Sequence, residues 1–70
     1  MAAGWKFAGV FKRGRETPLC LECVVALSDL QNAQKVAKQR LIGADEVTVT
    51  ELSKHELKAL KIEDGADVFL

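Results

Sequence analysis

The sequence predicts an α+β fold with the element order β-β-α-β-α-β, built in two layers, with both helices packed on one face of a largely antiparallel or mixed sheet. Three observations lead to it: two alternating apolar segments flank a turn, two helix-capping signals each follow a strand-like segment, and a short apolar segment comes last. A chain of 70 residues has the size of one small domain, so we expect residues 1–70 to fold together.

The first two strands are predicted from alternation. Aromatic side chains share one parity in residues 5–12, and apolar side chains share one parity in residues 19–27. Residues 13–18 contain the turn formers, and this interval of about six residues favours an antiparallel hairpin with a loop longer than the tight two-residue turns. The side chains expected on one face of the hairpin are Trp5, Phe7, Phe11, Leu19, Leu21, Cys23, Val25 and Leu27.

Residues 28–43 carry the signals of an amphipathic helix. Ser28 and Gln31 have the spacing of a capping box, in which each side chain accepts a hydrogen bond from the other residue's backbone N–H. Gly43 suits the left-handed conformation that often ends a helix. The predicted buried stripe, whose alanines would let the helix lie close to the sheet, consists of Leu30, Ala33, Val36, Ala37 and Leu41.

A third strand is predicted over residues 45–52, where valine and threonine alternate as in a half-buried strand. Ser53 and Glu56 then have the spacing of a second capping box, and Leu52 before the cap can pack on Leu57 as a hydrophobic staple. After a turn at residues 63–65, the chain ends with a fourth strand over residues 67–70.

Composition and charge narrow the classes of function. Ten basic and ten acidic side chains give a formal net charge of zero, so the overall charge favours neither nucleic acid nor an anionic membrane. No apolar run approaches the ~18–20 residues of a membrane span, and two cysteines are too few for the disulfide framework of a secreted mini-protein. We therefore expect a cytoplasmic protein that needs no cofactor.

Cys20 and Cys23 form the one motif with chemistry of its own, because a Cys-x-x-Cys pair can bind zinc or form a redox disulfide. In an extended strand the two side chains point to opposite faces, with Cα atoms roughly 10 Å apart, which is too far for a disulfide. His55, which we expect on the surface, is the only other Cys or His ligand, so a zinc site would need two subunits. Structural thiols are the favoured interpretation; an intersubunit metal site and redox work are the alternatives.

The end of the chain, ELSKHELKALKIEDGADVFL, resembles locally the helix, glycine turn and strand of swapped-hairpin transition-state regulators of the AbrB type. Members of that family are dimeric DNA binders, which is the role that the resemblance implies. It covers less than a third of the chain, and the Gly-Arg strand entry and the helix arginines usual in that family have no counterpart here. Common supersecondary structure is enough to explain it, and no family is assigned.

The sheet face away from the helices is the predicted binding surface. A contiguous apolar patch with a charged rim usually marks a protein interface, although an ordinary solvated sheet face is the competing interpretation. The residues expected there are Ala8, Val10, Val24 and Ala26 in the centre, with Lys6 and Glu22 at the rim. An exposed edge strand could also accept a strand from a partner or from a second copy in a homodimer. Since no catalytic constellation is visible, we expect a small non-enzymatic adaptor, inhibitor or regulator that binds a protein.

Nucleic-acid binding is the alternative function. Lys12, Arg13 and Arg15 form the densest basic cluster, at the hairpin tip, and Lys6 shares the strand parity of Lys12. Cations beside a sheet can contact phosphates, although solvated turn charge, partly balanced by Glu16, explains the same residues.

Overall fold

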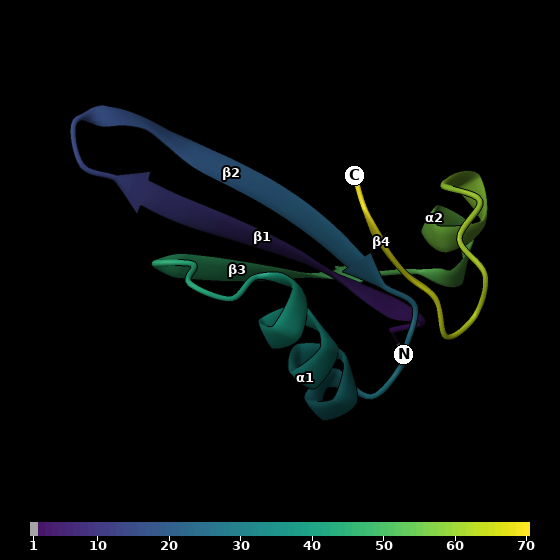
Figure 1. The fold of residues 1–70 in the computed structure, drawn as a ribbon. Helices are drawn as coiled ribbons and strands as arrows, with labels where there is room; N and C mark the ends of the chain where they lie inside the picture. The colour runs from purple at the N-terminus through teal and green to yellow at the C-terminus, as the bar shows by residue number, and fades with distance from the viewer. Residues whose placement is uncertain (1) are drawn as a thin grey trace.

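The computed structural model describes residues 2–70 and confirms the predicted α+β class and element order (Figure 1). The elements are β1 (Gly4–Arg13), β2 (Glu16–Val25), α1 (Leu30–Arg40), β3 (Glu46–Leu52), α2 (Lys54–Ala59) and β4 (Asp67–Phe69). The strands form one open sheet in the order β3-β1-β2-β4, and every neighbouring pair is antiparallel. Neither helix within residues 2–70 has the length and apolar character needed to cross a membrane.

The β1–β2 hairpin turns at Gly14 and Arg15, a two-residue loop in place of the predicted longer one. Gly14 takes a left-handed φ of 66° at the first loop position, as in a type II′ turn, whose twist matches that of the flanking strands. Pro18 lies inside β2, on a stretch beyond the reach of β4, where a proline is tolerated because one side of the strand is open. The strands therefore run to the tip, and the hairpin projects beyond its neighbours (Figure 1).

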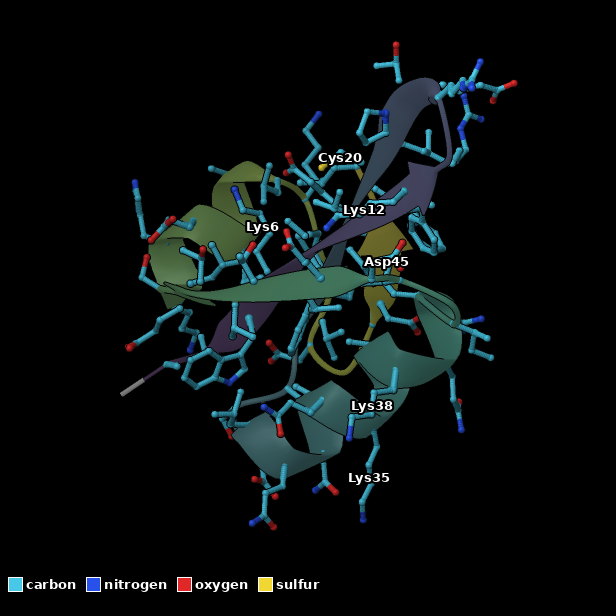
Figure 2. All side chains as sticks on the ribbon, turned by 90° about the vertical axis from the view of Figure 1, so that its left-hand side faces the viewer. Lys6, Lys12, Cys20, Lys35, Lys38 and Asp45 are labelled. Carbon is cyan, nitrogen blue, oxygen red and sulfur yellow. The ribbon has the colours of Figure 1, made fainter. Side chains whose placement is uncertain are left out.

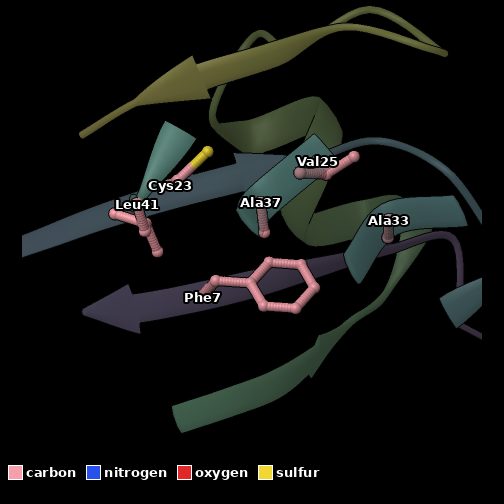
Figure 3. Packing of buried hydrophobic residues seen from close by; sticks show 6 residues of the cluster. All are labelled: Phe7, Cys23, Val25, Ala33, Ala37 and Leu41. Carbon is pink, nitrogen blue, oxygen red and sulfur yellow. The ribbon is translucent and has the colours of Figure 1, made fainter. Parts of the chain in front are cut away.

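One face of β1 and β2 is covered by α1. Phe7 pairs with Cys23, which confirms the predicted parity of the two strands. Ala33 and Ala37 are 0% and 3% exposed, because their short side chains let the helix approach the sheet. The buried cluster between helix and sheet consists of Phe7, Cys23, Val25, Ala33, Ala37 and Leu41 (Figure 3).

The second helix, α2, packs on the opposite face of the sheet, which corrects the expectation that both helices share one face. Leu57 of α2 is buried with Leu52 and Val24, and a Cβ on Gly4 would lie 3.0 Å from Leu57 Cδ1. The position of Leu52 in β3 determines the face of the sheet on which α2 packs. It pairs with Gly4 and lies three residues beyond Val49, so the two side chains point to opposite faces. The staple from Leu52 to Leu57 then directs α2 away from α1.

The first helix begins one residue later than predicted. Asp29 is the N-cap: its carboxylate accepts hydrogen bonds from the backbone N–H of Gln31 at 3.1 Å and from Asn32 Nδ2 at 2.9 Å. The carbonyl of Ser28 instead accepts a hydrogen bond from Trp5 Nε1 at 3.3 Å. A carboxylate at this position also stabilises the positive end of the helix dipole, which a serine hydroxyl does not.

The second helix begins as predicted. Ser53 Oγ accepts a hydrogen bond from the backbone N–H of Glu56 at 3.1 Å, and the Glu56 carboxylate accepts one from the N–H of Ser53 at 3.2 Å. Both residues of the predicted staple, Leu52 and Leu57, are buried. Local capping and tertiary packing agree at this helix.

Candidate functional site

The residues predicted to form a binding surface share one face of the sheet, but the apolar centre of that face is largely covered. Lys6 pairs with Val24 and Ala8 pairs with Glu22, so these side chains do share the face opposite α1. Val24 is 0% exposed and Ala26 is 5% exposed, because both pack in the cluster beneath α2. These two residues belong to the core and are out of reach of a partner while α2 is in place. The residues of this face that stay accessible on β1 and β2 include Lys6, Ala8, Val10, Cys20 and Glu22.

The basic residues near the hairpin are dispersed among carboxylates. Three of the four predicted cations form exposed or half-exposed ion pairs, with nitrogen-to-oxygen distances between 3.2 and 3.8 Å. The pairs are Lys6–Glu22, Lys12–Glu46 and Arg13–Glu16, and Figure 2 labels Lys6 and Lys12. Along an extended strand, Lys6 and Arg13 are roughly 23 Å apart. Exposed pairs of this kind add little stability, but each places a negative charge where a phosphate would have to bind.

Asp45 connects β1 to the start of β3. Its carboxylate accepts a hydrogen bond from the backbone N–H of Lys12 at 2.7 Å, and its own N–H donates to the carbonyl of Val10 at 2.8 Å. The contact lies where the pairing register of β1 shifts, between Phe11 and Arg13. Asp45 is therefore explained by its role in holding the strands together.

The two cysteines lie on opposite faces of β2, as predicted, with Cys20 exposed and Cys23 buried. Burial is the main cause that raises the pKa of the Cys23 thiol; the negative charge of Asp67 raises it further, and Arg40 opposes both. Within residues 2–70 no group of three Cys, His, Asp or Glu side chains is arranged to hold a metal ion. His55 is exposed on α2, as expected.

An apolar groove lies between α1 and the edge strand β3. Val47 and Val49 point to the α1 side of the sheet, yet they remain 48% and 41% exposed. Ile42, just beyond the helix, is 77% exposed. The groove has a volume of about 400 Å³, and its lining includes Gln34, Lys38, Leu41, Ile42, Val47 and Val49. Figure 2 looks onto this side of the molecule, with β3 in front and Lys38 on the helix below it.

Sequence reasoning missed this groove, although it correctly predicted the strand. Alternation over residues 45–52 indicates that one face of the strand is apolar, but alternation contains no information on strand order. In the structure β3 lies at the edge, while α1 contacts β1 and β2. The valines of β3 therefore face the helix layer without being covered by it.

The opposite edge of the sheet has a different character. β4 has only three residues, and it pairs with β2 from Cys23 to Val25. Phe69 and Leu70, at the end of the chain, are 52% and 60% exposed. Toward the hairpin tip, where β4 no longer pairs with β2, the edge is formed by β2 itself, and this stretch includes Pro18. Short length and proline both limit the pairing that an edge can offer to another strand.

No protein-family model, no curated protein and no solved structure matches the chain.

Proposed function

We propose that the protein is a small non-enzymatic interaction module that binds a protein partner by strand addition to β3. In this mode an extended segment joins a sheet edge, where main-chain hydrogen bonds provide affinity and alternate side chains provide specificity. The observation that carries the proposal is the exposure of Val47 and Val49, 48% and 41%, beside a groove of about 400 Å³.

The edge formed by β3 has few of the features with which proteins usually block strand addition. Those features are short length, proline, bulges and charged side chains, especially lysine; the charges of β3, Glu46 and Glu51, lie on either side of its central four residues. β3 has seven residues without proline or lysine, and residues 47–50 are uncharged Val-Thr-Val-Thr. Its pairing with β1 continues without a bulge from Gly4–Leu52 to Val10–Glu46. Compared with β4 and the proline-containing stretch of β2, β3 offers a partner the longer uninterrupted strand.

The groove defines the chemistry of the strand that would bind. Side chains at alternate positions of an added strand would point to the α1 side, where Val47, Val49 and Ile42 favour apolar groups. Lys38 on the helical wall favours an acidic residue toward one end of that strand. The proposed partner segment is therefore extended, apolar at alternate positions and acidic at its flank.

The proposal is tested by titrating the isotope-labelled protein with a seven-residue peptide that has valine at alternate positions and glutamate at both ends. We expect amide shifts in β3 and along the groove from Gln34 to Ala44. The same peptide with a central proline should not bind, because proline interrupts the pairing. Val47→Asp should weaken binding, whereas Val68→Asp, at a 36% exposed valine on β4, should leave it unchanged.

For a chain that is monomeric at the concentration used, an absence of shifts in β3 at millimolar peptide would contradict the proposal, as would shifts confined to β4. The same titration with DNA and RNA at low salt tests the alternative function. Shifts around Arg13 and Arg15 that disappear as salt is added would favour nucleic-acid binding over strand addition. The ion pairs of Lys6, Lys12 and Arg13 make that outcome the less expected one.

A further inference from the structure

We propose that the strand added to β3 is β3 of a second copy of this chain, paired antiparallel about a two-fold axis at Val49. This inference rests on the proposed function and names its partner. A two-fold axis perpendicular to the sheet pairs each residue with the one at equal distance on the other side of Val49, and it keeps every side chain on its own face. The two four-stranded sheets would become one continuous sheet.

An axis at Val49 uses the whole strand. Val49 is the middle of the seven residues from Glu46 to Leu52, so all seven find a partner in the second copy. An axis at Thr48 shortens the pairing and places Glu51 opposite Asp45, two acids in direct contact. An axis at Thr50 also shortens it, since the chain enters α2 after Leu52.

The side chains opposed by this register are compatible on both faces. On the α1 side, Val49 meets Val49 of the second copy, and Val47 meets Glu51. On the other side, Thr48 meets Thr50, and the remaining pair is Glu46 with Leu52. Cross-strand pairs of β-branched side chains and of threonines stabilise antiparallel sheets, and no acid lies directly opposite another acid.

Charge complementarity supports the same register. Within residues 2–70, neither Lys38 nor Glu51 takes part in an ion pair. The register brings Glu51 of the second copy beside Val47, which lines the groove together with Lys38. The two-fold axis repeats this arrangement, so each groove of the dimer would contain Lys38 of one copy and Glu51 of the other, two opposite charges that attract each other.

Two variants with the same chemical change separate this register from any other mode of association. Val47 and Val49 lie on the same face of β3, line the same groove and are similarly exposed. Val→Lys at either site therefore introduces the same charge and removes the same apolar side chain from the groove. Val49→Lys places the two introduced lysines opposite each other, whereas Val47→Lys places each lysine opposite Glu51. By sedimentation equilibrium from micromolar to millimolar protein, we expect a dimer whose Kd rises at least about tenfold with Val49→Lys and changes less than about threefold with Val47→Lys.

Disulfide trapping provides a second measurement, which reports which residues of the two strands face each other. In a Cys20→Ser background, Val49→Cys should form a cross-linked dimer on mild oxidation, because the two introduced thiols meet at the axis. Val47→Cys should not, because its symmetry mate is roughly 13 Å away along the strand. Circular dichroism melts of all variants show that each is folded before its association is measured.

The outcomes separate the two proposals. A chain that stays monomeric at millimolar concentration overturns the homodimer, and the proposed function still stands if the valine peptide shifts β3. Equal weakening by both lysine variants, or cross-linking at residue 47, overturns the axis at Val49. A chain that neither self-associates nor binds the peptide overturns both.

Discussion

Arg40 Nε and Asp67 Oδ2 lie 2.5 Å apart, so a single ion pair joins the end of α1 to the start of β4. The two residues are 27 positions apart in the chain. This hydrogen bond and the charge of Asp67 raise the pKa of Arg40. The same two charges act on Cys23, which is buried in the cluster beneath α1: Asp67 raises its pKa and Arg40 lowers it. The Arg40–Asp67 pair thus connects β4 to α1, and its two charges shift the pKa of the Cys23 thiol in opposite directions.

The raised pKa of Cys23 predicts that the protein loses stability in alkaline solution. The ordinary pKa of a thiol here is 9.0, and burial keeps Cys23 protonated above that pH in the folded state. Above about pH 9 the unfolded chain therefore binds fewer protons than the folded one, and the free energy of unfolding falls as pH rises. Below about pH 9 the thiol is protonated in both states, so the contribution of Cys23 to the free energy of unfolding is fully present.

The measurement is urea unfolding of the wild type and of Cys23→Ala at pH 7.5 and at pH 10. The wild type should lose more stability between these two pH values than the variant, because the two proteins share every ionisable group except the Cys23 thiol. A difference in stability that does not change with pH would contradict the prediction.

Gly4 and Gly9 provide a test of the two-sided packing. A Cβ on Gly4 would lie 2.8 Å from the carbonyl oxygen of Val25, a backbone atom that cannot move aside easily. A Cβ on Gly9 would lie 3.2 Å from Leu41 Cδ2, the end of a flexible side chain on the α1 side. Gly4→Ala should therefore destabilise the fold by about 1–3 kcal/mol, and Gly9→Ala by less. Thermal melts that rank the two variants in the opposite order would contradict the close approach of Val25, and of Leu57 of α2, to Gly4.

Val24 and Val10 should respond differently to the same substitution. Val24 is fully buried beneath α2, so Val24→Asp would bury a carboxylate without a partner and should cost roughly 3 kcal/mol or more, enough to unfold much of a small domain. Val10 is half-buried on the open part of that face, and Val10→Asp should leave a cooperative fold. Circular dichroism and thermal melts distinguish the two, and a folded Val24→Asp protein would place Val24 on a surface.

The cap of α1 can be tested by paired alanine substitutions. Asp29→Ala removes the acceptor for Gln31 N–H and for Asn32 Nδ2, and it should cost about 1 kcal/mol. Ser28→Ala removes a hydroxyl but keeps the carbonyl that Trp5 contacts, so its effect should stay within about 0.5 kcal/mol. Chemical denaturation measures both, and a larger loss for Ser28→Ala would restore the capping box that the sequence predicts.

The misplaced cap shows why local patterns locate a helix better than its first residue. Ser28 and Asp29 are both good N-cap residues, so spacing alone cannot choose between them. In the structure Asp29 is the cap, and Ser28 instead contributes its carbonyl, which accepts a hydrogen bond from Trp5 Nε1, 23 positions away in the chain. The second cap had no such competitor, and Ser53 was predicted correctly.

The sequence by itself determined the fold class, the order of the elements and the two faces of each strand, because alternation and capping act within about ten neighbouring residues. Only the tertiary structure decided that β3 lies at an edge and that α2 packs opposite α1. Those two facts place Val24 in the core and leave Val49 exposed. They depend on pairings such as that of Gly4 with Leu52, which join distant parts of the chain and leave no local pattern in the sequence.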